Sequence, residues 1–306
     1  MRLCALILGL SLACHAATHY VTVAGLGGEP DYEQRFTSLA KEIDKLLRGS
    51  AGGGRVETLA GPQATRAKLS EVLATLSKAA TAQDSLVLML IGHGTFDGAD
   101  YKFNVPGPDV SSVELASLLD RIPGQQLVVN MTSCSGGAVH ALMKEGRAVI
   151  TATKSGTEKN ATVFARYWAE ALRDTGADTD KNEVISALEA FKYANEKTQR
   201  FYETQKRIAT EHAQMEDTGK GEPTRAPAPD NGQGLLAGKF PLLRIGSAQV
   251  AANNPSKRKL LEKKEELEQK IDQLKYQRAA MPTDQYRKQL AALLLDLART
   301  QEEIDK

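Results

Sequence analysis

Cysteine is scarce in this chain: only Cys4, Cys14 and Cys134 occur among 306 residues, too few for a disulfide framework. Neither sign of charge is in excess, because 39 Lys and Arg residues balance 38 Asp and Glu residues. This balance provides no basic field for a nucleic acid. Long apolar runs are also lacking, since the longest beyond the first 16 residues, 86–91, falls well short of the ~20 residues of a membrane-spanning helix. We therefore expect a globular protein with no nucleic-acid partner and no transmembrane segment.

The first 16 residues have the pattern of a signal peptide. An early arginine is followed by the stretch 3–13, which is apolar apart from one serine, and small residues suit cleavage after Ala16. The same stretch weakly resembles a lipoprotein box, in which Cys14 would carry a lipid anchor. We expect ordinary cleavage and export, to the periplasm or out of the cell. Cys134 would then be the one cysteine of the mature chain, and an unpaired thiol is unusual in an oxidising compartment.

Apolar patterns predict strands that alternate with helices. The run 85–91 is apolar without alternation, as in a strand that is covered on both faces of a parallel sheet. The predicted strands are 20–26, 55–59, 85–91, 126–131 and 148–153, and helical spacing occurs in 36–47, 69–76, 111–122, 161–172 and 184–201, with a small excursion at 101–105. Such alternation is typical of an open, mostly parallel α/β sheet with helices on both faces.

The composition changes towards the C-terminus. We expect one domain over 17–250, within which Gly, Pro and polar residues predict a flexible loop at 211–234. The stretch 235–245 predicts one further strand or edge segment. Apolar stripes on both sides of Met281-Pro282 predict a helical hairpin of coiled-coil type over 255–306. We expect this hairpin to mediate self-association or to recruit a protein partner.

Two of the predicted strands end in turns with reactive side chains. His93 and Gly94 follow one strand, and Cys134 follows another within the sequence Ser-Cys-Ser-Gly-Gly. Because the carboxyl ends of parallel strands share one edge, and the separation of 41 positions between His93 and Cys134 leaves room for a crossover, the two side chains can meet. An imidazolium would lower the pKa of the thiol, and the N–H groups of Gly94 and Cys134 could hold an oxyanion. The sequence thus predicts nucleophilic catalysis, against the alternative that Cys134 is a small buried apolar residue.

With this order of motifs, the sequence resembles the clan of cysteine peptidases that contains caspases and legumain. The legumain type is more similar, because Val23-Ala24-Gly25 and the pair Asp31-Tyr32 also match its pattern. The resemblance implies a caspase-like three-layer α/β/α sandwich with a mostly parallel sheet, to which the C-terminal helical hairpin is added. It also implies an endopeptidase that works through an acyl-enzyme and needs no cofactor for catalysis. The implied catalytic residues are His93 and Cys134 as a dyad, with Gly94 in the oxyanion hole.

The substrate preference is predicted to differ from that of legumains. After the Asx-Tyr pair, legumains have Arg-His in the pocket for a substrate asparagine, whereas this chain has Glu33-Gln34. An acidic Glu33 in that pocket would prefer a basic side chain, so we expect a protein or peptide substrate that is cut after Arg or Lys. The alternative function is a catalytically silent caspase-like module for binding or scaffolding, whose helical hairpin recruits a partner.

A second set of candidate ligands lies in the stretch 178–189. Oxygen-bearing residues stand at positions 1, 3, 5, 9 and 12 of a calcium-binding loop, with a backbone carbonyl at position 7. The predicted calcium ligands are Asp178, Asp180, Asn182, Val184, Ser186 and Glu189. Glu183 departs from the pattern, because the sharp turn there usually requires glycine. The alternative is a helix start that is capped by Asp180 or Asn182.

Overall fold

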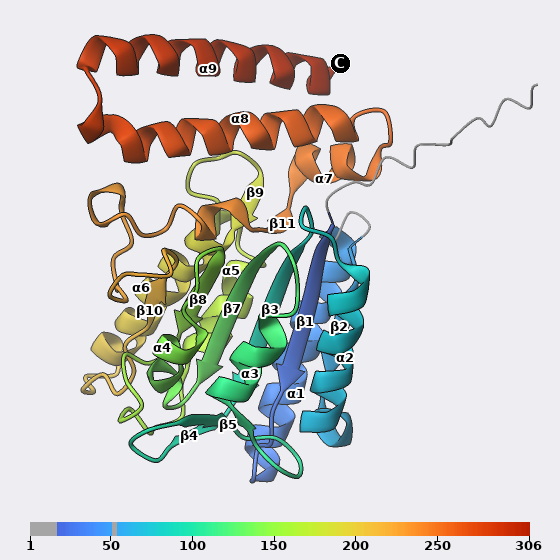
Figure 1. The fold of residues 1–306 in the computed structure, drawn as a ribbon, viewed down its shortest axis with the longest axis vertical. Coiled ribbons are helices and arrows are strands. Elements are labelled where there is room, and N and C mark those ends of the chain that lie inside the picture. The colour runs from blue at the N-terminus through green and yellow to red at the C-terminus, as the bar shows by residue number, and fades with distance from the viewer. Residues whose placement is uncertain (1–16, 51–53) are drawn as a thin grey trace, which may run out of the picture.

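The computed structural model describes residues 17–50 and 54–306 (Figure 1). The predicted signal peptide, with Cys14, lies outside these residues. At the centre is a six-stranded sheet in the order β10-β8-β7-β3-β1-β2. Its strands are β1 (Thr18–Ala24), β2 (Val56–Leu59), β3 (Ser85–Gly92), β7 (Gln125–Thr132), β8 (Arg147–Thr151) and β10 (Gln214–Glu216). All neighbouring strands are parallel except β10 and β8, so the predicted mostly parallel sheet is confirmed.

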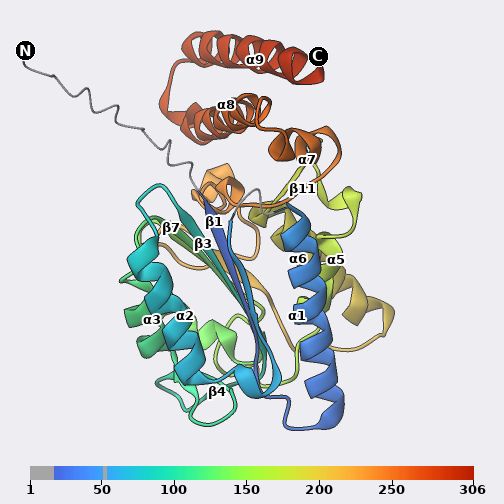
Figure 2. The ribbon, with the colours of Figure 1, turned by 90° about the vertical axis from the view of Figure 1, so that its right-hand side faces the viewer.

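Helices cover both faces of the sheet (Figure 2). On one face lie α1 (Pro30–Ser50), α5 (Phe164–Ala171) and α6 (Ala187–Thr204), and on the other lie α2 (Arg66–Ala79), α3 (Ser112–Leu119) and α4 (Val139–Leu142). The side chains of β3 alternate between the two cores: Val87, Met89 and Ile91 join the first, whereas its even-numbered leucines join the second. This two-sided burial explains the unbroken apolar run and confirms the three-layer α/β/α sandwich.

A small antiparallel sheet follows β3, where the sequence predicts an excursion. It consists of β4 (Gly94–Phe96), β5 (Tyr101–Phe103) and β6 (Val110–Ser111). The buried hydroxyl of Tyr101 lies 2.6 Å from the Oγ1 of Thr132 and donates to the Oδ1 of Asn130 at 3.2 Å. These bonds fix the small sheet against the end of β7.

The stretch 211–234 contains a strand where its composition predicts a loop. Strand β10 lies within it and pairs antiparallel with β8. Three residues are too few to produce a periodic pattern, so the tertiary pairing and the burial of Met215 decide its conformation. The predicted strand in 235–245 is β11 (Pro241–Arg244), but it pairs with β9 (Val184–Ser186) in a separate two-stranded sheet.

Strand β9 occupies the first residues of the predicted helix 184–201. The helix begins three residues late because Ser186 is its N-cap: the Ser186 hydroxyl accepts the N–H of Glu189, and the Glu189 carboxylate accepts the N–H of Ser186. This reciprocal pair satisfies two backbone donors at the helix start. A capped start of α6 is therefore present, with Ser186 as the cap in place of Asp180 or Asn182.

The C-terminal residues form the predicted helical hairpin at the edge of the sheet remote from β4 (Figure 1). Its helices are α8 (Arg258–Gln277) and α9 (Thr283–Asp305), and a helix that the sequence analysis missed, α7 (Gly246–Asn253), precedes them. Arg244 binds Glu265 of α8 through two bonds of 2.7 and 3.0 Å, and Lys264 donates to the carbonyl of Asn182 at 3.0 Å. The hairpin is thus attached to the α/β domain through α8. Among the described residues, no helix is both long enough and apolar enough to cross a bilayer.

Candidate functional site

The two motifs with reactive side chains lie at the same edge of the sheet. Strands β3 and β7 pair in parallel up to the last residue of each. His93 follows β3 directly, and Cys134 comes two residues after β7. Between them, the Oγ of Ser133 accepts the N–H of Gly94 and donates to the carbonyl of Gly94, each at 3.1 Å. The topology therefore brings together the two turns that the sequence singles out.

The imidazole of His93 packs against α1. Its ring makes edge contacts with Tyr32 and Phe36, at centroid distances of 4.7 and 5.1 Å. Burial lowers the pKa of His93 below its ordinary value, while the charge of Glu29 opposes this change and that of Arg35 adds to it. The ring is consequently neutral at neutral pH, which is the state in which it can accept a proton.

Cys134 is almost completely enclosed, with 2% of its surface exposed. Its φ of 58° is left-handed, a conformation that a residue other than glycine adopts rarely and mostly in constrained turns. Burial raises the pKa of the thiol above its ordinary value, and the charge of Lys159 opposes the rise. The expectation of a lowered thiol pKa is therefore wrong for this state, because desolvation outweighs the surrounding charges.

Both predicted oxyanion donors are engaged by acceptors within the chain. The N–H of Cys134 donates to the carbonyl of Glu158 at 2.9 Å, and the N–H of Gly94 donates to Ser133. Glu158 belongs to residues 152–163, which connect β8 to α5 and which we call the cover loop. An oxyanion hole needs donors that are free to face the substrate. The predicted oxyanion hole is thus closed in this structure.

The carboxylate of Glu158 joins the cover loop to His212. Its oxygens lie 2.5 Å from the Nδ1 of His212, 3.2 Å from the N–H of His212 and 2.9 Å from the N–H of Lys154. The loop also packs tightly on the turn that carries Cys134, since a Cβ atom at Gly136 would lie 2.2 Å from the backbone nitrogen of Ser155. The glycine at position 136 is therefore needed for close packing against the cover loop.

Gly94 is enclosed as tightly as the cysteine. A Cβ atom there would lie 2.4 Å from the ring of Tyr101 and 2.6 Å from the carbonyl oxygen of Ser133. Packing alone thus requires glycine at this position. Its proposed catalytic use adds to a structural requirement that the fold already imposes.

Glu33 lies in the first turn of α1, and its carboxylate binds the loop that precedes the helix. One carboxylate oxygen accepts the N–H of Gly27 at 2.9 Å. This bond stabilises the connection between β1 and α1, a role that sequence reasoning missed. The effect of Glu33 on substrate choice remains a prediction.

Several residues around the site belong to no recognisable motif. Phe36 stands one helical turn after Tyr32, so the helical spacing alone would have placed it on the same face. Glu158 and Lys159 occur in a polar loop with no local pattern. Only the position of that loop, after the strand adjacent to β7, could have indicated its closeness to Cys134.

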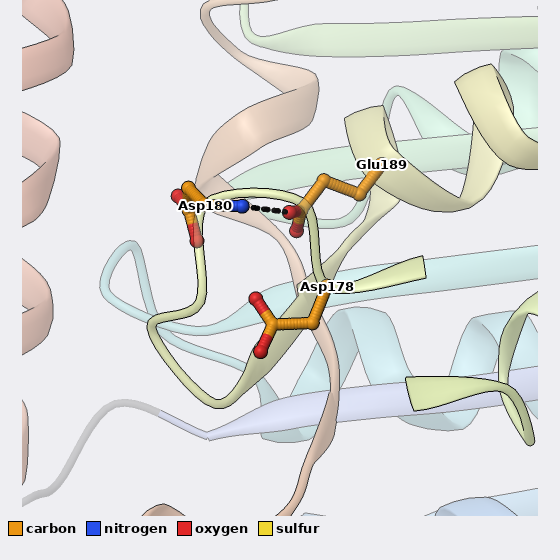
Figure 3. A group of neighbouring side chains, drawn as sticks. All are labelled: Asp178, Asp180 and Glu189. Carbon is orange, nitrogen blue, oxygen red and sulfur yellow. Dashed lines mark hydrogen bonds between the residues drawn. The ribbon is translucent and has the colours of Figure 1, made fainter. Parts of the chain in front are cut away.

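Three of the six predicted calcium ligands come together in the 178–189 loop. Asp178, Asp180 and Glu189 offer carboxylate oxygens within 4.8 Å of one another (Figure 3). The others make bonds inside the loop: the side chain of Asn182 accepts the N–H of Val184 at 2.8 Å, and the Ser186 hydroxyl donates to Glu189 at 2.8 Å.

Glu183 adopts the conformation that the calcium pattern normally reserves for glycine. Its φ is 68°, in the left-handed region. Its carboxylate also accepts the Ser247 hydroxyl at 2.5 Å and the N–H of Ala248 at 2.9 Å, in the first turn of α7. Bonds to the start of α7 offset the cost of the left-handed backbone, which explains why glutamate is compatible with this turn.

Calcium binding by this loop is a prediction. Burial, with the charges of Glu189 and Asp178, raises the pKa of Asp180 to about 6, and a divalent cation would relieve the repulsion among these carboxylates. We expect calcium to give a measurable heat of binding on titration into the metal-free protein and Asp178→Asn to weaken that binding. Calorimetry is the measurement, and the absence of heat at millimolar calcium in the unmodified protein would contradict the prediction.

No family model matches this chain, and no curated protein matches its sequence. Solved structures with a similar fold include protein GSU0716 from Geobacter sulfurreducens, with a TM-score of 0.48 and 12% identity over 75% of this chain and 100% of that one. Caspase-1 from Spodoptera frugiperda has a TM-score of 0.43 and 11% identity, covering 60% of this chain and 76% of the caspase. The Drosophila initiator caspase Dronc has a TM-score of 0.43 and 11% identity, covering 67% and 81%. Caspases are thus among the solved structures to which the fold of this chain is similar.

Proposed function

We propose that this protein is an exported cysteine endopeptidase of the legumain or caspase type, seen here in a closed state. The observation that supports the proposal best is the joined ends of β3 and β7. They hold the imidazole of His93 and the thiol of Cys134 beyond the carboxyl ends of two adjacent parallel strands. In α/β sheets, ligands bind beyond these ends.

In the proposed reaction, His93 accepts the thiol proton as the Sγ of Cys134 attacks the carbonyl carbon of the scissile peptide bond. The directions of the two pKa shifts favour this general-base route over a preformed thiolate and imidazolium. The imidazolium then gives the proton to the leaving amine, and a thioester remains on Cys134. Water, deprotonated by His93, hydrolyses the thioester and restores the thiol.

Opening of the cover loop is a necessary step in this proposal. Opening frees the N–H of Cys134 from the carbonyl of Glu158, and the N–H of Gly94 becomes available when the Ser133 hydroxyl turns away from it. We expect Glu158→Ala, which removes both bonds from the loop to His212 and the bond to Lys154 within the loop, to speed labelling of Cys134 by an electrophilic peptide at least about tenfold. The exposed Glu145→Ala variant is the matched control. Equal labelling rates for Glu158→Ala and the unmodified protein would show that the cover loop does not restrict access.

The proposed substrate is a polypeptide that is cut after Arg or Lys, with Glu33 as the residue that selects the basic side chain. A fluorogenic peptide library is the test, applied to both the unmodified protein and Glu158→Ala. We expect preference for Arg or Lys and a loss of that preference in Glu33→Gln. Preference for Asn would support a legumain-like pocket, preference for Asp would contradict both assignments, and no cleavage by either protein would contradict the peptidase proposal.

A catalytically silent caspase-like scaffold is the second candidate. The observations that favour it are the 2% exposure of Cys134, its raised thiol pKa and the two engaged N–H groups. In that case these features are permanent properties of a packed turn. Removal of the Cys134 thiol distinguishes the two functions, because only a peptidase would lose peptide cleavage.

A further inference from the structure

The outer surface of α9 carries exposed apolar side chains. A different side of the helix contains its buried residues, Thr300 and Ile304. At 100° per residue, Leu294 lies about 80° and Leu295 about 180° round the helix from Ile304, and they leave 47% and 53% of their surfaces exposed. The other exposed large apolar residues in the described part of the chain stand apart in the sequence: Leu26, Val113, Ile208 and Val250. These two adjacent exposed leucines make the outer face of α9 the candidate interaction surface.

The position of α9 in the fold leaves this surface accessible. Figures 1 and 2 show α8 lying between α9 and the α/β domain, with α9 as the outermost element. The hairpin occupies the edge of the sheet opposite the small β4–β5 sheet (Figure 1). A partner on α9 would therefore approach from the side remote from His93 and Cys134.

The residues on the outer face of α9 are placed nearly symmetrically about the middle of the helix. Leu294 and Leu295 form its centre, and the exposed alanines Ala291 and Ala298 stand at equal distances on either side. At 100° per residue, these four residues occupy an arc of about 100°. The alanines allow the backbone of a second helix to approach closely, and the leucines would pack on those of a second copy.

The charges nearest the apolar centre of this face are complementary to each other. Arg287 and Lys288 precede the apolar centre, and in the described part of the chain neither has an acidic partner. Glu302 follows the centre at the same distance as Arg287 precedes it, and its one ion pair is with the exposed Lys306 at 3.1 Å. A second α9 laid antiparallel would place Arg287 of each copy opposite Glu302 of the other. A parallel arrangement would bring like charges together.

We infer that two copies of this chain associate through the outer faces of their α9 helices, antiparallel, about a two-fold axis at Leu294 and Leu295. Such an interface is self-complementary, as two-fold symmetry requires. It joins two hairpins into a helical assembly and leaves both candidate sites on its outer sides. The inference does not depend on catalysis.

Sedimentation velocity over a range of protein concentrations tests the inference. The full protein should form a reversible dimer, and Leu294→Gln combined with Leu295→Gln should weaken it roughly 100-fold, because four leucine side chains leave the interface. Val250→Gln removes an exposed apolar residue of α7 and should leave the dimer unchanged. Circular dichroism confirms that each variant is folded. A monomer at every concentration, or a dimer that the leucine substitutions do not weaken, would overturn the inference.

Charge reversal tests the antiparallel orientation. Arg287→Glu and Glu302→Arg should each weaken the dimer, because each places like charges opposite one another. The two substitutions in one chain should restore it, since every facing pair is again of opposite sign. In a parallel dimer the combination would restore nothing, and that result would overturn the antiparallel arrangement.

Discussion

Replacing Cys134 by alanine is expected to lower kcat/KM for a peptide substrate by at least about 1,000-fold, because the atom that forms the acyl-enzyme is removed. The substitution deletes one buried sulfur atom and leaves the turn between β7 and α4 otherwise intact. His93→Gln should cause a loss of similar size, since the proton acceptor is removed. His140→Gln is the matched control, because His140 is exposed.

The Glu158→Ala background makes this comparison sharper, because the site is then expected to be open. Cleavage of peptides, or of the chain itself, at equal rates with and without the Cys134 thiol would contradict the peptidase proposal. Unchanged behaviour in every assay, with folding intact by circular dichroism, would favour the scaffold.

Acidification from pH 8 to pH 5.5 is expected to stabilise the fold by about 2 kcal/mol through Glu211 alone. This side chain is 2% exposed, and burial raises its pKa to about 7. Its carboxylate accepts the N–H groups of Val163 and Phe164 at 2.7 and 3.2 Å and the Tyr202 hydroxyl at 3.0 Å, and the charge of Glu158 adds to the rise in its pKa.

The sign of this effect follows from which state holds the proton more tightly. A folded-state pKa of about 7 lies above the ordinary glutamate value, so the folded protein binds more protons over this range. The free energy of unfolding therefore falls as the pH rises toward 7 and stays low above it. Urea unfolding at pH 5.5 and pH 8 is the measurement, with Glu211→Gln expected to reduce the difference. Burial also raises the pKa of Glu268 to about 7, so Glu268 contributes to the pH dependence that remains in Glu211→Gln. The lowered pKa of His93 acts in the opposite direction, so the comparison of the two proteins is decisive: a pH dependence that Glu211→Gln leaves unchanged would contradict the account.

The parts of the fold that rest on strong local patterns could be predicted from the sequence. The apolar run 85–91 required a strand with both faces covered, and β3 has its side chains in both cores. The stripes on either side of Pro282 likewise predicted α8 and α9. By contrast, β10 is three residues long and exists only because β8 offers it a partner, so no local pattern could reveal it.

The candidate site could be located from the sequence but its state could not. The order of the motifs around His93 and Cys134, together with the edge rule for parallel sheets, placed the two turns side by side. The closure of the site depends on a carbonyl of Glu158, and any residue type supplies a backbone carbonyl. The thiol pKa likewise depends on how deeply the fold buries it, which the nearby residue types do not reveal.

Labelling with an electrophilic peptide probe, with the modified residue mapped by mass spectrometry, tests the central claim most directly. The unmodified protein should carry a single label on Cys134, and the reaction should be faster in Glu158→Ala, slower in His93→Gln and absent in Cys134→Ala. A failure of both the unmodified protein and Glu158→Ala to react, or a label on any other residue, would contradict the assignment of Cys134 as a catalytic nucleophile.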